Sequence, residues 1–144
     1  MLSLNIEAKS FDWEKFKQHN RKIVNSKPEN IMANFNLIIA LSNTGEIQQS
    51  YKLINELGQK TTIKNFTGII TPYLEKINKN TCDVLLLNYA AFYELIKNNY
   101  NPAITYFKRI SKIESKNIWI QNYMASCYIE LEKFKEAERI IKKS

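Results

Sequence analysis

The amino-acid sequence predicts an all-α fold of about eight or nine helices. Gly and Pro are scarce, with three of each in 144 residues, and an all-β fold of this length would need more turn residues. Apolar residues recur at helical spacing, and the helical stretches are separated by short gaps. Short gaps make successive helices pack antiparallel. A chain of this length buries a core without needing a disulfide or a metal.

The first two helices are predicted over 11–25 and 30–43. Ser10 is the expected N-cap of the first helix, and Pro28 follows its end. The second helix ends in a turn in which Gly45 fits the left-handed position just past the last helical residue.

The third helix is predicted over 46–58. Residues 61–80 are also helical in pattern, but Thr71 followed by Pro72 is typical of an N-cap and the first turn of a new helix. Either one helix kinks here or two short helices meet. Because a proline inside a helix costs about 3 kcal/mol, two short helices are predicted.

Four helices complete the chain, over 82–97, 101–114, 117–131 and 134–143. Cys82 and Cys127 both lie inside these apolar helical patterns. Two buried free thiols are therefore expected, rather than a disulfide framework.

The last two helix pairs repeat with a period of 34 residues. Ala103 lies 34 residues before Ala137, and the same interval separates Tyr100 from Phe134. A small residue at this place, with Ser50 in an earlier copy, lets the second helix of a pair approach the first. A period of this length is typical of stacked helix pairs.

These motifs resemble the tetratricopeptide repeat family, whose 34-residue helix–turn–helix unit reads W-x2-L-G-x2-Y, then A-x3-F, then P. Ala103-x3-Phe107 matches the A-x3-F element, and Met124-Ala125-x2-Tyr128 stands for L-G-x2-Y. Departures also occur, because Asn34 and Gln121 replace the consensus tryptophan.

The resemblance implies a right-handed superhelical array of antiparallel helix pairs. On this basis 1–144 is one domain, with an N-terminal helix and first unit over 11–58, an irregular unit over 59–81, and the best-matching units over 82–116 and 117–144.

The sequence predicts neither catalysis nor a cofactor or metal site. His19 is the only histidine, which excludes a His-based metal cluster. Neither cysteine has a histidine nearby in sequence, and the three glycines form no phosphate-binding loop.

Binding another protein is the expected function, as an adaptor, scaffold or assembly factor. The resemblance implies a concave groove lined by the first helix of each pair. Its implied groove residues are Met32, Phe35, Asn36, Ile39, Asn88, Phe92, Leu95, Trp119, Asn122, Ser126 and Ile129.

Trp119 is the favoured anchor, and packing against Ile113 is the alternative role. Family members that bind acidic chaperone tails carry Lys and Arg at groove positions, and these positions here do not. The expected partner is therefore an apolar or amide-rich protein segment.

Two other functions stay open. A net charge of +7 is typical of nucleic-acid binders. Only three of the basic residues are Arg, however, and the abundance of Lys, Asn and Ile is typical of an AT-rich, bacterial genome. The chain is alternatively an interaction domain cut from a larger membrane-attached or envelope protein. No window here approaches 18 apolar residues, so no transmembrane segment is predicted.

The compartment and the oligomeric state are less determined. A cytoplasmic location is slightly favoured over the envelope. Phe134, Ile140 and Ile141 cannot all face inward from the last helix, so a homodimer through this uncapped C-terminal helix is a further expectation.

Overall fold

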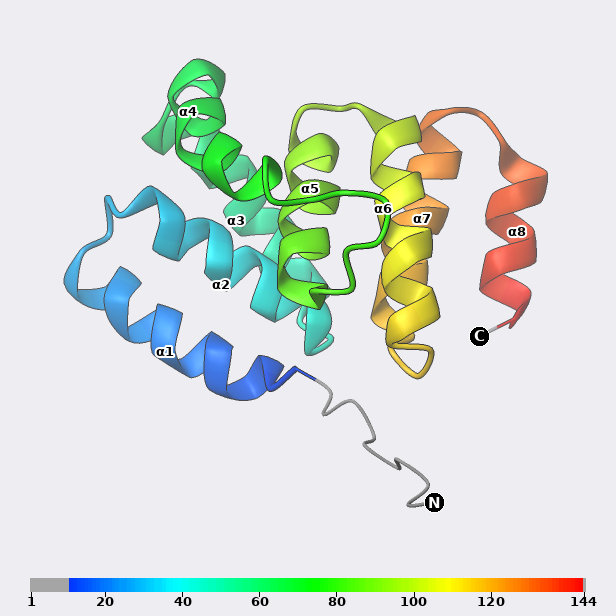
Figure 1. Cartoon of the computed structure of the whole chain (residues 1–144), viewed down its shortest axis with the longest axis horizontal. Coiled ribbons are helices and arrows are strands. Elements are labelled where there is room, and N and C mark those ends of the chain that lie inside the picture. Colours follow the sequence, from blue (N-terminus) through cyan, green and yellow to red (C-terminus); the bar gives the residue numbers. More distant parts are fainter. Residues whose placement is uncertain (1–10, 144) are drawn as a thin grey trace.

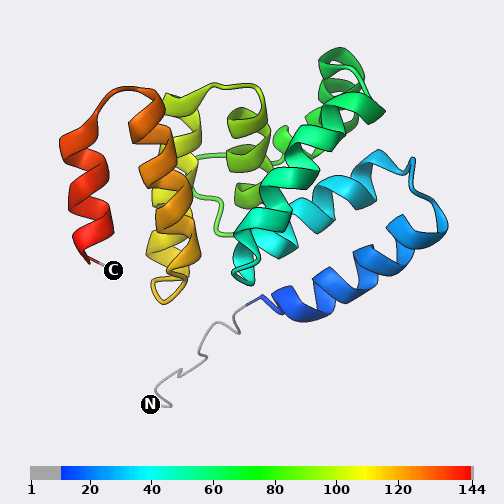
Figure 2. The ribbon, with the colours of Figure 1, turned by 180° about the vertical axis from the view of Figure 1, so that it is seen from behind.

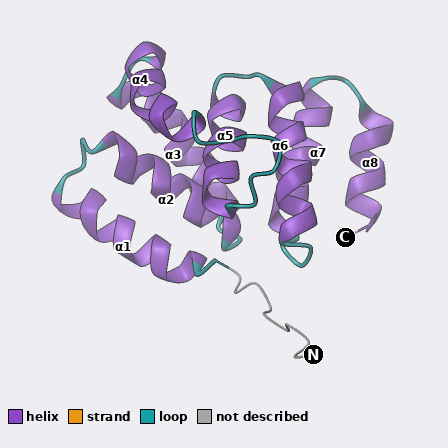
Figure 3. Ribbon diagram, viewed as in Figure 1, coloured by secondary structure: helices purple, strands orange, loops and turns teal. Residues whose placement is uncertain are grey.

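The computed structural model describes residues 11–143, and within them it contains helices and no strands (Figure 3). The all-α prediction is confirmed. The eight helices are α1 Trp13–Ser26, α2 Ile31–Asn43, α3 Ile47–Lys60, α4 Ile63–Leu74, α5 Val84–Ile96, α6 Tyr100–Ile113, α7 Trp119–Glu130 and α8 Phe134–Lys143.

Short polar side chains begin several of these helices. The Asp12 carboxylate accepts a hydrogen bond from the Lys15 backbone N–H at 3.0 Å and so caps α1. The Ser10 cap that the sequence predicts lies outside the described residues. Asp83 caps α5 in the same way, through the Leu86 backbone N–H.

Helices that follow one another pack in pairs, as in a helical-repeat array, except for α3 and α4, because α4 packs on α5 instead. In Figure 1 the helices α5 to α8 stand side by side, and α1 and α2 are inclined to them. Seen from behind, α3 passes close to α7 (Figure 2). The Tyr51 and Tyr123 rings, 5.4 Å apart, join these two helices. The right-handed superhelix that the resemblance implies stays a prediction.

The core is continuous and strongly aromatic. Phe35 of α2 contacts Phe66 of α4 at 4.9 Å between ring centroids, and Phe92 of α5 contacts Tyr123 of α7 at 5.0 Å. The small residues of the repeat pattern are all buried where paired helices approach: Ser50, Ala103 and Ala137. The periodic pattern therefore located close helix contacts correctly.

The predicted break at Thr71–Pro72 is wrong, because α4 runs through both residues. Pro72 lies in the last turn of α4, two residues before the helix ends. Its missing N–H removes one backbone hydrogen bond, the one that a helix would form to the carbonyl of Gly68, an exposed residue. Phe66 and Ile70 before the proline are buried, and Tyr73 and Leu74 after it pack against the same core, which favours a single helix.

The segment after α4 is a loop rather than a second helix. Residues 75–83 are held by the Arg109 guanidinium of α6, which donates to the Asn78 carbonyl at 2.7 Å and to the Thr81 carbonyl at 3.2 Å. Cys82 lies on this loop and is exposed, so the prediction that it is buried is wrong. The helix begins at Val84 after its Asp83 cap, which leaves Cys82 outside the apolar face.

Burial of titratable groups in α7 predicts loss of stability in alkali. Burial raises the pKa of the Cys127 thiol from 9.0 to about 12, with a smaller contribution from Glu130, and raises the pKa of the Tyr123 hydroxyl from 10.0 to about 12. Between pH 9 and 12 the unfolded chain therefore binds fewer protons than the folded chain. We expect the free energy of unfolding to be unaffected below pH 9 and to fall above it, by up to ~1.4 kcal/mol per pH unit for each group.

Urea unfolding at pH 8.0 and about pH 10.5, followed by circular dichroism, measures this difference. A free energy of unfolding that is equal at the two values would contradict the expectation.

Candidate functional site

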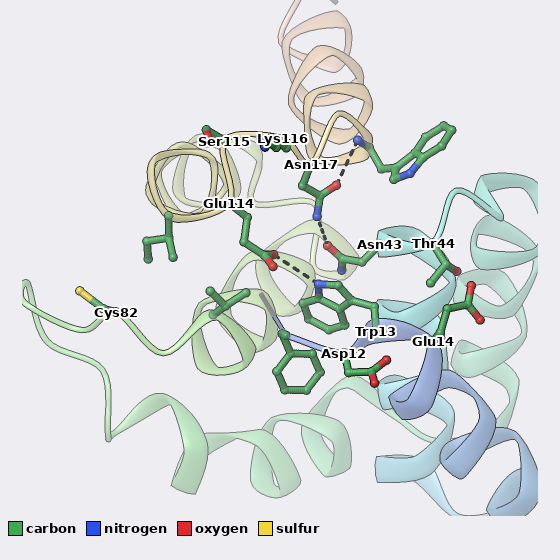
Figure 4. Close-up of a pocket in the computed structure, with 14 residues that line it drawn as sticks. Asp12, Trp13, Glu14, Asn43, Thr44, Cys82, Glu114, Ser115, Lys116 and Asn117 are labelled. Carbon is green, nitrogen blue, oxygen red and sulfur yellow. Dashed lines mark hydrogen bonds between the residues drawn. The ribbon is translucent and has the colours of Figure 1, made fainter. Parts of the chain in front are cut away.

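An open cleft of about 930 Å³ lies between the start of α1 and the α6–α7 connection. Four segments line it: the start of α1, the α2–α3 turn, the residues before and at the start of α5, and the α6–α7 connection with the first turn of α7 (Figure 4). Its lining residues are Phe11, Asp12, Trp13, Glu14, Asn43, Thr44, Cys82, Val84, Ile113, Glu114, Ser115, Lys116, Asn117 and Trp119.

Trp13 lies at the base of this cleft, where its side chain is buried and only 7% exposed. Its indole Nε1–H donates a hydrogen bond to Glu114 Oε1 at 3.3 Å, which connects α1 to the α6–α7 connection 101 residues later. The Phe11 ring lies 4.3 Å from the indole and Phe16 supports both rings from α1. The result is an aromatic cluster at the base of the cleft, with Glu114 on one side of the indole and Asp12 on the other (Figure 4).

Trp119 borders the cleft from the start of α7. Its ring lies against Gly45, whose φ of +86° is in the left-handed region as the sequence predicted. A Cβ atom built on Gly45 would lie 2.6 Å from Trp119 Cζ2, so the glycine is needed both for its conformation and for this contact. The α2–α3 turn therefore fixes the position of the tryptophan ring.

A chain of side-chain amides forms the polar base beneath these residues. Asn117 Nδ2 donates to Asn43 Oδ1 at 2.7 Å, and Asn43 Nδ2 donates to Asn88 Oδ1 at 2.9 Å. Asn117 also accepts the Trp119 backbone N–H, and Asn88 donates to the Val84 carbonyl. We call Asn117, Asn43 and Asn88 the amide chain, and it joins α2, α5 and the α6–α7 connection.

Five of the groove residues predicted from the resemblance lie in the core. Phe35, Ile39, Asn88, Phe92 and Leu95 are buried, and Asn88 belongs to the amide chain. These five have no surface to offer a partner, so their assignment to a groove is corrected. The reason is that α2 packs on α5 and α4, which covers the faces assigned to a ligand.

The other predicted groove residues are separated from one another. Met32 is half-buried against the core, and Asn36 is held between the Asn20 amide and the Tyr89 hydroxyl. Asn122 and Ile129 are exposed on α7, and Ser126 between them is half-buried. Only Trp119 of the predicted set lines the cleft.

Sequence reasoning missed most of the cleft. The sequence analysis gave no binding role to Trp13, and none to four other residues of the cleft: Asp12, Asn43, Glu114 and Asn117. A periodic pattern identifies the residues that face a neighbouring helix, but it does not identify contacts across 101 residues. The one available signal was that the chain has only two tryptophans, Trp13 and Trp119, and both line this cleft.

The comparisons with known proteins add no relative. No family model, curated protein or solved structure matches this chain. Within residues 11–143, no His, Cys, Asp and Glu side chains form a group of three or more that could hold a metal ion. No helix in the same part of the chain is long and apolar enough to span a membrane.

Proposed function

We propose that this chain is a protein-interaction module that binds a segment of a partner protein in the Trp13–Trp119 cleft. The observation that carries the proposal is the cleft itself, about 930 Å³ in volume, which is bordered by the half-buried Trp119 and has the buried Trp13 at its base. Tryptophan is enriched among the residues that dominate binding energy at protein interfaces. The proposal assigns the chain a binding role in an adaptor or assembly factor, and no catalysis.

The shape and composition of the cleft favour a protein ligand over the nucleic-acid alternative. Three carboxylates, Asp12, Glu14 and Glu114, line it beside a single ammonium group, Lys116. Phosphate groups bind to positive surfaces, and their binding weakens steeply with salt. The cleft offers apolar side chains and carboxylates instead. The carboxylates repel phosphate, and the apolar side chains suit a peptide segment that is itself apolar.

Affinity capture from a lysate of the source organism tests the proposal. A cleft variant, Ser115→Tyr with Cys82→Tyr, narrows the cleft at two exposed positions outside the core. A matched control, Asn122→Arg with Ile129→Glu, changes two exposed positions on α7 that the resemblance assigns to the groove. Circular dichroism must first show that both variants are folded.

We expect one protein to be captured by the wild type and by the α7 control, and to be lost with the cleft variant. Titration calorimetry with that purified protein should then show a Kd at least about tenfold higher for the cleft variant, a difference of 1.4 kcal/mol. If only the α7 control failed to capture the protein, the binding surface would lie on α7 instead of the cleft. Capture of nucleic acid alone, removed between about 0.05 and 0.2 M salt, would favour the nucleic-acid alternative.

A further inference from the structure

We propose that two copies of this chain associate through α8, by packing the two helices antiparallel across a face made of Phe134, Glu138 and Ile141. This inference goes beyond the proposed function, because none of these residues lines the Trp13–Trp119 cleft. We call the three residues the α8 face. They lie on one side of the helix, since positions three, four and seven residues apart share a side.

The α8 face is exposed although two of its three residues are large and apolar. Phe134 is 61% exposed and Ile141 is 56% exposed, the two highest values among the large apolar residues of the described chain. Ala137 is buried instead, and Ile140 packs against the core. One side of α8 therefore packs on α7, and the α8 face is turned toward solvent. Large apolar side chains that gather on an exposed surface mark interaction sites.

The corresponding face of α6 is covered by another helix. The residues 34 positions before the α8 face are Tyr100, Ile104 and Phe107, and the last two are buried. The Phe107 ring stacks on the Tyr123 ring of α7 at 6.1 Å between centroids, and α6 packs along α7. This side of the second helix in a pair therefore accepts a further helix, and α8 presents the same side.

Glu138 indicates what kind of helix fits on the α8 face. It stands 34 residues after the buried Ile104, and its exposed side chain forms an ion pair with Lys142 at 2.7 Å. An apolar helix packed here would take this carboxylate out of water without offering it a cation. A second α8 offers two, because Lys135 and Lys142 border the α8 face on the side of Glu138.

An antiparallel arrangement brings these opposite charges together. When Phe134 of one copy is level with Ile141 of the other, Glu138 lies about 3 Å along the helix axis from Lys135 of the second copy, at a rise of about 1.5 Å per residue. The twofold symmetry of such a dimer forms the same contact twice and covers both apolar side chains of each copy. The antiparallel helix dipoles add to the attraction.

The contact is small, so the dimer is weak. α8 has 10 residues, and a pair of helices of this length buries less than the roughly 1,600 Å² of a standard interface. We expect a dissociation constant of about 10–100 μM, in the range of transient contacts. Unfolding measured at about 1 μM therefore follows the monomer.

Sedimentation equilibrium of the full chain at about 1–500 μM measures this association. The wild type should sediment as a monomer of 16.9 kDa at the lowest concentration and approach twice that mass at the highest. Phe134→Glu puts a charge into the apolar contact and should raise the dissociation constant at least about tenfold. The matched control is Ile63→Glu, the same kind of change at an exposed residue of α4, and it should leave the constant unchanged. Circular dichroism must show that both variants are folded.

Two charge reversals distinguish a contact between copies from an effect within one helix. Glu138→Lys and Lys135→Glu each place like charges across the dimer, so each alone should raise the dissociation constant by about three- to tenfold. An equal mixture of the two variants should associate about as tightly as the wild type. In that mixed dimer, each position 135 faces a position 138 of opposite charge.

A chain that stays monomeric up to about 500 μM would overturn the inference. It would also be overturned by a dimer that Ile63→Glu weakens as much as Phe134→Glu does, or by charge variants that associate no better mixed than alone. None of these outcomes bears on the cleft, which the capture experiment with the Ser115→Tyr, Cys82→Tyr variant tests separately.

Discussion

Truncation of Phe92 to alanine is expected to lower the free energy of unfolding by about 3–5 kcal/mol. The Phe92 side chain is fully buried in α5, and its ring packs edge-on against Phe107 of α6 at 5.3 Å and Tyr123 of α7 at 5.0 Å. Removing it leaves a cavity at the junction of three helices and also removes two aromatic contacts. The loss is a large part of the total stability of about 5–15 kcal/mol that is typical of a domain.

The matched control for this experiment is Phe134→Ala, the same substitution at a side chain that is 61% exposed. We expect the control to lie within about 0.5 kcal/mol of the wild type. Urea unfolding followed by circular dichroism at 222 nm measures both variants. If Phe92→Ala were as stable as the control, Phe92 would not be a core residue, and the groove position that the repeat resemblance implies would be favoured.

Two glycine-to-alanine substitutions are expected to change stability in opposite directions. Alanine at Gly45 would hold a side chain at a φ of +86° and place its Cβ 2.6 Å from the Trp119 ring. The left-handed backbone costs about 1–2 kcal/mol and the overpacking about 1–3 kcal/mol, so we expect Gly45→Ala to destabilise the fold by about 2–5 kcal/mol.

Alanine at Gly58 meets different surroundings. Gly58 is exposed within α3, and a Cβ atom there would have no neighbour within 4 Å. Because alanine favours the helix over glycine, Gly58→Ala should stabilise the protein by about 0.5–1 kcal/mol. Thermal unfolding of the two variants beside the wild type distinguishes them, and a shift of the same sign in both would rule out the strain attributed to Gly45.

The helices were predictable because their causes are local. Gly45 ended α2 where expected, and the 34-residue interval placed the buried Ala103 and Ala137 at close helix contacts. The error at Pro72 has a physical basis, since the proline removes one backbone hydrogen bond from α4 only two residues before the helix ends. The packing of Tyr73 and Leu74 against the core favours the helical continuation that the proline opposes.

The cleft was not predictable in the same way. The repeat pattern indicates which residues face the next helix. The family resemblance then assigned another face of α2, which includes Phe35, to the ligand-binding groove. In the structure α4 and α5 cover that face. The Phe35 ring lies 4.9 Å from the Phe66 ring of α4 and 5.7 Å from the Tyr89 ring of α5. The hydrogen bond from Trp13 to Glu114 depends on how α1 lies relative to α6, and no local pattern in the sequence encodes that placement.

The amide chain has a consequence for how the protein responds to its surroundings. Asn117, Asn43 and Asn88 carry no net charge and do not titrate, so neither pH nor ionic strength acts directly on the contact between α2, α5 and the α6–α7 connection. Carboxylates on the open cleft above them are screened by salt. Changes in ionic strength therefore act on the charged side chains of the cleft and leave unaffected the amide chain, which joins α2, α5 and the α6–α7 connection.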